Sequence, residues 1–270
     1  MSLTIDRFVA KDQPGFLSLA TAEGWLCDHW EFDFLLHQPL AGCFVIRRGL
    51  LACAYITAIA YGTAGWIGNL IVAPEYRQQG LGRWLMQAAI TFLDDARTDC
   101  IWLTASQQGA HLYAQLGFRQ IDRIRRWVGC SSEGFTVVRP TALDLERVSA
   151  CDAAGWGTPR TSLLLEKAQL SESWQNARAF IMRQVTDSGT QIGPWGGEPD
   201  AAAELFPISL AGQAGKRIFL DSPAANVFAA ELFAALGMTC RGETVLMCRG
   251  DTSGYSPAHV FALGTMGSVG

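Results

Sequence analysis

An internal repeat constrains the fold of this 270-residue chain more than any other feature. Four short segments of the first half recur in the second half in the same order and at similar spacing. The pairs are Thr4–Arg7 with Thr136–Arg139, Ala22–Trp25 with Ala153–Trp156, Ile101–Thr104 with Ile218–Asp221, and Leu116–Phe118 with Leu236–Met238. A repeat of this length is a domain rather than a solenoid unit. We therefore predict two similar domains, residues 1–130 and 135–270, that meet in the turn-prone stretch Gly129–Gly134.

The composition limits the classes of function. Apolar residues make up 49% of the chain and charged residues 17%, as expected of a globular protein with a sizeable core. The net charge of −4 and the lack of dense Lys or Arg runs argue against a nucleic-acid or membrane partner. Eight scattered cysteines form no Cys-x-x-Cys pair, so we expect no metal site. With no apolar leader at the start of the sequence, we expect a cytoplasmic protein.

The first half alternates between strand and helix signals. Apolar runs predict strands at 44–48, 51–58, 66–72 and 101–104, with a tight turn at Gly49 between the first two. Between the last two strands, Leu81–Leu93 has helical spacing with one apolar face. A short helix over His111–Leu116 should end at Gly117. This order predicts an α/β fold with helices on the faces of a sheet.

The turn between the third strand and the long helix suggests a phosphate site. In Arg77-Gln78-Gln79-Gly80-Leu81-Gly82, glycines without a Cβ would let the backbone approach a phosphate. The unpaired N–H groups and the dipole of the helix N-terminus would bind it, with Arg77 and Arg83 on either side. Alternatively, the two glycines only permit tight packing. The Gly-Lys-Ser/Thr of a Walker loop and the Gly-x-Gly-x-x-Gly of dinucleotide folds are both absent.

Two separate segments resemble the Gcn5-related N-acetyltransferase (GNAT) superfamily. Val72–Gly82 is similar to its signature, Arg/Gln-x-x-Gly-x-Gly/Ala after a strand that ends in Val-x-Pro. Ser106–Arg119 is similar to its closing segment, in which an aliphatic-tyrosine pair precedes Leu-Gly-Phe. The resemblance covers residues 4 to about 128 directly and 136 to about 250 through the repeat. It implies tandem GNAT-like domains, each a mostly antiparallel twisted sheet flanked by helices, as in a bacterial subgroup whose second domain is degenerate.

The resemblance also implies a cofactor, a reaction and a set of site residues. The cofactor is acetyl-CoA, and its acetyl group passes directly to a primary amine in a ternary complex. The backbone N–H of Leu70 would polarise the thioester carbonyl, and Tyr113 would protonate the departing thiolate. The cofactor-binding residues by resemblance are Leu70, Ile71, Val72, Arg77, Gln78, Gln79, Gly80, Leu81, Gly82, Arg83, Ser106 and Tyr113. No metal is implied.

The sequence departs from the family at the general base. The two strand positions that often hold a carboxylate are Trp66 and Thr104, and neither can accept a proton from an ammonium group. Water, solvent or a carboxylate from elsewhere remain as alternatives. The candidates in the early segment that usually shapes the acceptor pocket are Glu23, Asp28, His29, Glu31 and Asp33. A CoA-binding sensor without turnover is the competing function, although the intact Tyr113 argues against it.

The second copy lacks the features of a working site. Aligning Pro194 with Pro74 sets Gly197 against Arg77, Asp200 against Gly80 and Ala202 against Gly82, and Phe233 takes the place of Tyr113. A carboxylate at this position would repel a pyrophosphate. The second copy would therefore be structural, completing a pseudo-dimer within one chain, or would form a wall of the acceptor pocket. The residues for such a wall are Trp156, Arg160, Trp174 and Trp195. We expect one active site per chain, a small-molecule or peptide amine as acceptor, and a monomer or homodimer.

Overall fold

The computed structural model describes residues 2–131, 134–186 and 188–270 and packs as two compact units. The first unit runs to Leu103 and includes Gly267–Val269, and the second holds Thr104–Met266 and Gly270. This division by packing differs from the predicted division into repeat copies near residue 130, which stays a prediction. Ser132 and Glu133 of the predicted linker lie outside the described residues. Over the described part of the chain, no helix is long and apolar enough to cross a membrane.

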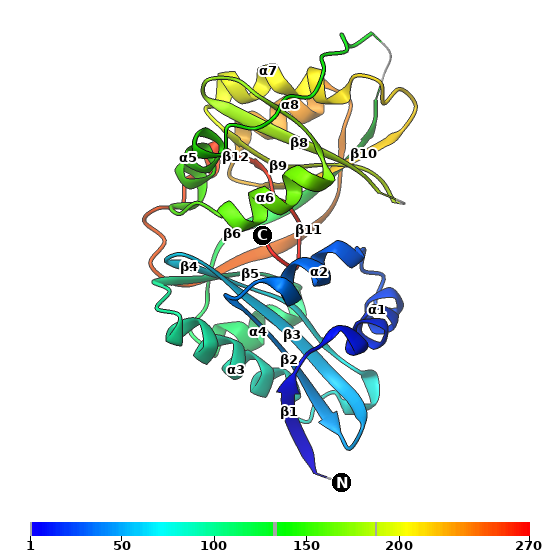
Figure 1. Cartoon of the computed structure of the whole chain (residues 1–270), viewed down its shortest axis with the longest axis vertical. Helices are drawn as coiled ribbons and strands as arrows, with labels where there is room; N and C mark the ends of the chain where they lie inside the picture. Colours follow the sequence, from blue (N-terminus) through cyan, green and yellow to red (C-terminus); the bar gives the residue numbers. More distant parts are fainter. Residues whose placement is uncertain (1, 132–133, 187) are drawn as a thin grey trace. The chain divides into compact units, whose positions relative to one another are not determined.

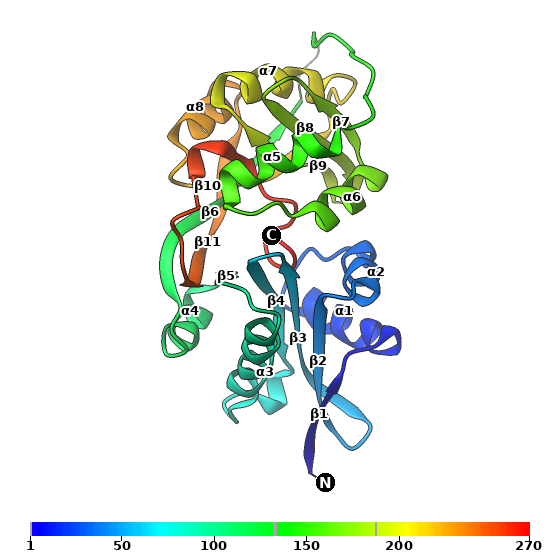
Figure 2. The same cartoon turned by 60° about the vertical axis from the view of Figure 1, so that its left-hand side comes forward.

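The first unit is a mostly antiparallel sheet with helices on both faces (Figures 1 and 2). Strands β1 to β4 pair in chain order as antiparallel neighbours, and β5 joins β4 in parallel. The strands are β1 (Leu3–Arg7), β2 (Ala41–Arg48), β3 (Leu51–Tyr61), β4 (Ala64–Val72) and β5 (Cys100–Ala105, of which 100–103 belong to this unit). The helices are η1 (Ala10–Asp12), α1 (Gln13–Ala22), α2 (His29–His37), η2 (Pro74–Tyr76) and α3 (Leu81–Asp95). The predicted fold class is confirmed.

Helix α3 is held directly against the sheet because two strand positions carry no side chain. A Cβ at Gly42 would lie 2.7 Å from the Phe92 ring, and one at Gly65 would lie 2.8 Å from Leu93. The apolar face predicted for this helix is buried, including Leu85 and Leu93 at 0% exposure. The helix N-terminus is therefore fixed relative to the end of β4.

The opposite face of the same sheet is covered by α1 and α2 through an aromatic cluster. Phe16 of α1 lies 4.6 Å from Phe32 of α2 and 5.7 Å from Tyr55 of β3, measured between ring centroids. Phe8 closes the cluster at 5.5 Å from both Phe32 and Tyr55. Such edge and tilted contacts add to the stabilisation from burial of the rings. The early segment thus shields this face of the strands that precede the turn.

The second unit is a mixed sheet whose strands come from both repeat copies. Its strand order is β11-β6-β10-β9-β8-β7, with β12 paired to β9, and β9 and β10 run parallel. The strands are β6 (Arg119–Cys130), β7 (Glu172–Gln175), β8 (Ala179–Thr186), β9 (Gly189–Gly197), β10 (Arg217–Pro223), β11 (Thr239–Gly250) and β12 (Val260–Ala262). The helices are α4 (Gln107–Ala114), α5 (Leu145–Trp156), α6 (Thr161–Leu170), α7 (Pro199–Leu210), α8 (Val227–Ala235) and η3 (Pro257–His259). Because β6 of the first copy lies between β11 and β10, the packing units do not follow the repeat.

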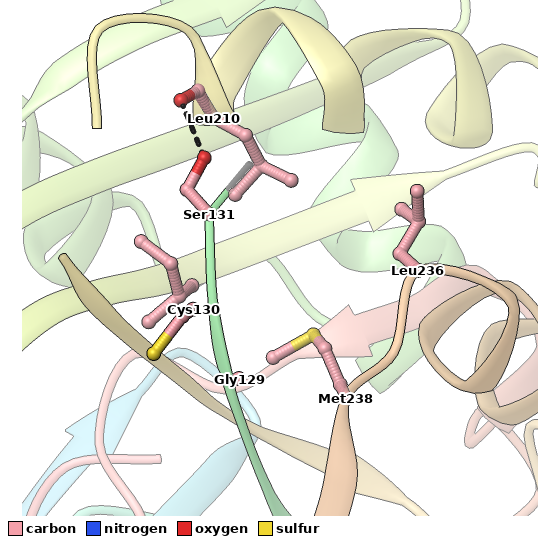
Figure 3. A pocket seen from close by; sticks show the side chains of 7 residues that line it. Gly129, Cys130, Ser131, Leu210, Leu236 and Met238 are labelled. Carbon is pink, nitrogen blue, oxygen red and sulfur yellow. Dashed lines mark hydrogen bonds between the residues drawn. The ribbon is translucent and has the colours of Figure 1, made fainter. Parts of the chain in front are cut away.

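A small pocket lies beside the core of the second unit (Figure 3). It is lined by Gly129, Cys130, Ser131, Leu210, Ile218, Leu236 and Met238. The Ser131 hydroxyl donates a hydrogen bond of 3.1 Å to the Leu210 carbonyl at its rim. The cavity volume is only about 10 Å³, whereas ligand pockets usually span about 300–1,000 Å³. It is therefore too small for a CoA-sized ligand.

Candidate active site

Strand β4 has an edge that β5 leaves open. β3 pairs with β4 up to Val72 on one edge, whereas the pairs with β5 end at Trp66 with Trp102. Beyond that point, the described residues place no strand on the second edge. A bulge also interrupts the β3 ladder between Gly68 and Ile71, where Asn69 adopts a φ of +56°. The open edge offers the backbone of Leu70 to Val72 to a bound chain, as the resemblance implies.

The turn after β4 leads into the N-terminus of α3, where Gly80 is the N-cap residue. The first helical bond runs from the Trp84 N–H to the Gly80 carbonyl at 3.0 Å. The N–H groups of Leu81 and Gly82 precede it and have no partner within the helix. No side chain in the described part of the chain caps this N-terminus. Backbone donors and the dipole at a helix N-terminus both favour an anion.

Gly80 is the residue that makes this turn possible. It adopts a φ of +80°, a conformation that favours glycine, and a Cβ built there would meet nothing within 4 Å. The space next to it is thus open to a ligand. The next side chain, Leu81, is 3% exposed and anchors the turn in the core. At Gly80 the turn therefore presents backbone rather than a side chain.

Arg77 already has an acidic partner within the first unit. Its Nε donates to the Val72 carbonyl at 3.1 Å, and its Nη2 donates to Oε1 of Glu23 at 2.5 Å. Both side chains are partly exposed, so the pair contributes little to stability. The Glu23 carboxylate thus pairs with the Arg77 guanidinium, which the sequence predicts to be a phosphate ligand. An anion that enters the turn would compete with this carboxylate.

The other candidate bases of the early segment have local partners. Asp28 is the N-cap residue of α2 and shares a capping box with Glu31. The His29 ring lies 3.2 Å from the Gln13 amide. Of the five candidates only Glu31 is buried, at 6% exposure, and Asp33 is on the exposed side of α2. Trp66 at the family's base position is 1% exposed.

Tyr113 lies in the second unit, on α4. The residue is 9% exposed, its ring packs against Gly109, and its centroid lies 6.3 Å from that of Phe118. Burial raises the pKa of its phenol to about 12, so the proton is retained at neutral pH. Ser106 is the N-cap of α4 and accepts a hydrogen bond of 3.1 Å from the Gly109 N–H. Helix α4 begins four residues before the predicted start at His111, because this cap opens it at Gln107.

The position Thr104 also lies in the second unit. Its hydroxyl donates a hydrogen bond of 2.5 Å to the Met266 carbonyl. A neutral hydroxyl is too weak a base to take a proton from an ammonium group. Thr104 thus has a structural contact in this unit, and a different group must act as the base.

Strand β9 of the second copy corresponds to β4, and its open edge is filled. Both strands have nine residues, and β9 pairs with β10 at Thr190 and Gln191 as β4 pairs with β5 at Gly65 and Trp66. Further along the same edge, β12 pairs with Trp195 and Gly196 of β9. The backbone that would hold a cofactor arm in this copy is therefore bonded to the chain itself.

This register corrects the alignment of the two turns. Matching the parallel pairs sets Asn69 against Pro194 and Leu70 against Trp195, so the alignment of Pro194 with Pro74 was wrong by five positions. Pro194 and Trp195 lie within β9, which runs on to Gly197. Glu198 alone then separates β9 from α7, where residues 73–80 separate β4 from α3. The second copy has no phosphate turn to be compared.

The second copy also differs from the first in the side chains of α7 and α8. At the start of α7, Arg178 donates hydrogen bonds to both Glu198 and Asp200, and its side chain holds the pKa of Asp200 below its usual value. At the start of α8, Asn226 caps the Ala229 N–H at 2.9 Å, in the way that Ser106 caps α4. Phe233 then occupies the position of Tyr113 and is fully buried, as the repeat predicts.

The four residues suggested for an acceptor wall have partners inside the second unit. The Arg160 guanidinium pairs with the buried Asp152 and lies 4.7 Å from the Trp156 ring. The Trp174 indole donates to the Val138 carbonyl at 3.0 Å. Trp195 lies in an aromatic cluster, 4.8 Å from Phe206 and 4.7 Å from Phe261. These contacts support the structural alternative for all four.

Comparison with known proteins gives the family. Residues 39–120 match the family model described as "Acetyltransferase (GNAT) domain". The chain carries a GNAT acetyltransferase domain. It is therefore an acyltransferase, and β4, the turn, α3 and Tyr113 all lie within the matched residues. Enzymes of the family generally use acetyl-CoA.

The similar proteins each cover more than nine-tenths of the chain. The uncharacterized N-acetyltransferase YitH of Bacillus subtilis is 24% identical over 265 residues, which are 92% of each chain. A Pyrococcus horikoshii protein assigned as an acetyltransferase has a similar fold, with a TM-score of 0.84, 17% identity and coverage of 99% and 96% of the two chains. A tandem GNAT protein from the clavulanic acid biosynthesis pathway has a TM-score of 0.65, 12% identity and coverage of 92% and 98%. These likenesses support the tandem GNAT fold.

Sequence reasoning missed two contributors to the site. One is the bulge at Asn69, which a Gly-Asn pair inside an apolar strand could have signalled. The other is residues 267–269, which belong to the first unit although they are distant in sequence. Their composition, Gly-Ser-Val, has no motif, so no sequence pattern could have found them.

Proposed function

We propose that the first repeat copy transfers an acetyl group from acetyl-CoA to a primary amine, at one site per chain. The observation that carries the proposal is the open edge of β4, which leads through the Gly80 turn to the uncapped N-terminus of α3. An extended pantetheine arm fits the former, and a pyrophosphate fits the latter. The closed edge of β9 and the missing turn before α7 are the reasons to place only one site in the chain.

The residues near the turn fit the chemistry of this donor. The open space at Gly80 leaves room for phosphate oxygens, and the N–H groups of Leu81 and Gly82 would donate to them. The proposed phosphate ligands also include Gln78, Gln79 and the side chains of Arg77 and Arg83. Ile71 and Val72 would bond the pantetheine arm along the β4 edge, and Ser106 remains a proposed polar contact to it.

Two groups of the chain would act in the transfer. Acetyl-CoA supplies an acyl group activated as a thioester. The Leu70 N–H would donate a hydrogen bond to the thioester carbonyl oxygen and stabilise the negative charge that develops there. Tyr113, held protonated by its burial, would donate its phenolic proton to the sulfur as the C–S bond breaks. The new N–C bond forms directly with the amine, so no enzyme nucleophile is required.

Removal of the ammonium proton falls to water or to a carboxylate outside β4. Trp66 is buried and uncharged, and the Thr104 hydroxyl is bonded to a carbonyl. A free amine delivered from solvent would need no base at all. In that case the rate should rise with pH in step with the pKa of the acceptor amine rather than of a protein group.

The release of free thiol from acetyl-CoA over a panel of primary amines tests the proposal. Transfer to at least one amine is the expected result. In a binding titration, one acetyl-CoA should bind per chain. Gly82→Glu should abolish acetyl-CoA binding because a carboxylate would enter the phosphate site. Undiminished binding by that variant would contradict the assignment of the turn. Binding without thiol release for any amine would instead indicate a CoA sensor.

A further inference from the structure

Residues 267–269 are seated on β4 next to the proposed carbonyl site. The Asn69 N–H donates to the Gly267 carbonyl at 3.3 Å, and the buried Tyr61 hydroxyl donates to the Val269 carbonyl at 3.0 Å. Ser268 and Val269 are 3% and 0% exposed. All of these contacts lie within the first unit. The segment is thus a packed part of this unit.

The segment covers one particular face of β4. Gly65 points toward α3, because a Cβ there would contact Leu93. Successive strand residues alternate between faces, so Trp66 and Gly68 share the face away from α3. A Cβ at Gly68 would collide with the Ser268 carbonyl and would lie 2.6 Å from the Gly267 carbonyl oxygen. Gly68 is therefore the cradle for this segment, on the face that also carries the family's base position.

The second unit has an equivalent contact. Gly193 of β9 corresponds to Gly68 in the register of the parallel pairs. A Cβ at Gly193 would collide with the Leu263 carbonyl, just after β12 fills the edge of β9. In the first unit the Gly267 carbonyl accepts its hydrogen bond from Asn69, one residue before Leu70. The last residues of the chain thus contact the central strand of both copies, through β12 and Leu263 on β9 and through residues 267–269 on β4.

We propose that residues 267–269 form a fixed wall of the acceptor site and select amines by shape. The inference rests on the proposed function, because it places the reacting carbonyl at the Leu70 N–H. An amine that reaches this point has no space on the covered face for a substituent on the carbon that bears the nitrogen. The site should therefore favour unbranched primary amines over amines branched at that carbon. No residue of the segment carries a charged side chain, so the selection is steric.

The test compares butylamine with its branched isomer 2-aminobutane as acceptors. One variant ends the chain after Met266, and a second, Gly68→Ala, displaces the segment without removing it. Gly242→Ala is the control, since a Cβ there meets nothing within 4 Å. In the first two variants the kcat/KM ratio for 2-aminobutane over butylamine should rise about tenfold or more, the effect of one or two methylenes in a closed pocket. Acetyl-CoA affinity should stay within about twofold, because the phosphate turn is untouched.

Hydrogen exchange of a β4 peptide shows independently whether the segment has left, since the Asn69 N–H loses its acceptor. Fast exchange with an unchanged amine ratio in both variants would overturn the wall while leaving the transferase function intact. An equal gain for both amines would also overturn it, because a plug rather than a selective wall would have been removed. If the parent transfers to no amine, the proposed function fails, and this inference fails with it.

Discussion

Replacing Gly80 by alanine separates the structural role of the turn from its role in binding. Gly80 has a φ of +80° and open space around its Cβ position, so alanine meets no atom of the protein and only backbone strain results. Strain of this kind costs about 1–2 kcal/mol. In a chain of this size each kcal/mol lowers the Tm by about 2–4 °C. The fold should therefore survive the substitution.

The effect on acetyl-CoA should be larger, because the new methyl group points into the phosphate site. Loss of one hydrogen bond between a backbone N–H and a charged oxygen costs about 1.5–3 kcal/mol, or about 10- to 150-fold in Kd. Gly237→Ala is a matched control: its φ is +75°, it also faces open space, and it follows α8 of the second unit. Both variants should lose similar stability, and only Gly80→Ala should lose affinity.

Thermal unfolding without ligand and calorimetric titration with acetyl-CoA measure the two effects. The reasoning is refuted if Gly80→Ala binds acetyl-CoA as tightly as the parent. It is equally refuted if Gly237→Ala weakens binding to the same degree, because the loss would then follow from backbone strain in general. A much larger loss of Tm in Gly80→Ala than in the control would mean that the turn is also packed against other atoms.

Further predictions concern the acid, its titration, the paired arginine and the second unit. Tyr113→Phe should lower kcat about a hundredfold or more with little change in acetyl-CoA affinity, while Tyr255→Phe, at a half-buried tyrosine, should keep full activity in the same thiol assay. Because burial raises the pKa of Tyr113 from 10.0 to about 12, its share of the unfolding free energy is constant below pH 10 and is lost between pH 10 and 12. Urea unfolding at pH 8 and pH 11 should therefore show the parent losing about 1 kcal/mol more than Tyr113→Phe, and equal losses would contradict the burial. Glu23→Gln should tighten acetyl-CoA binding up to about fivefold by freeing Arg77, with the gain shrinking at high salt; a weaker complex would argue against competition for that guanidinium. Phe261→Ala should destabilise the protein by about 3–5 kcal/mol by urea unfolding, since the ring is fully buried, and a second equivalent of bound acetyl-CoA in this variant would contradict the loss of the second site.

Most of the first copy could be predicted from its sequence because its signals are local. Apolar alternation gave strands near β2 to β5, and helical spacing gave α3 with its buried face. The glycine at position 80 is required by backbone conformation at a strand-to-helix turn, so it shows in the sequence as plainly as in the structure. The sequence predicts α4 to begin at His111, four residues late, because Ser106 resembles a ligand contact as well as an N-cap residue.

The repeat was visible in the sequence, but its alignment was not. Pro194 and Pro74 look equivalent as letters, whereas the register of parallel pairs matches Pro194 with Asn69. A register depends on which strands pair, and a one-dimensional comparison carries no pairing information. The absence of the phosphate turn from the second copy therefore follows from the structure, in which Glu198 alone separates β9 from α7.

By itself, the sequence determined the family, the turn that suits a phosphate and the candidate acid, because each depends on residue types at fixed short spacing. The tertiary structure alone decided what lies against the edge of each central strand. β12 fills the edge of β9, and on β4 the Gly267 carbonyl accepts a hydrogen bond from Asn69, one residue before Leu70. Both are contacts between segments more than sixty residues apart in sequence. Such contacts are fixed by packing and hydrogen bonding in three dimensions, so no local pattern records them.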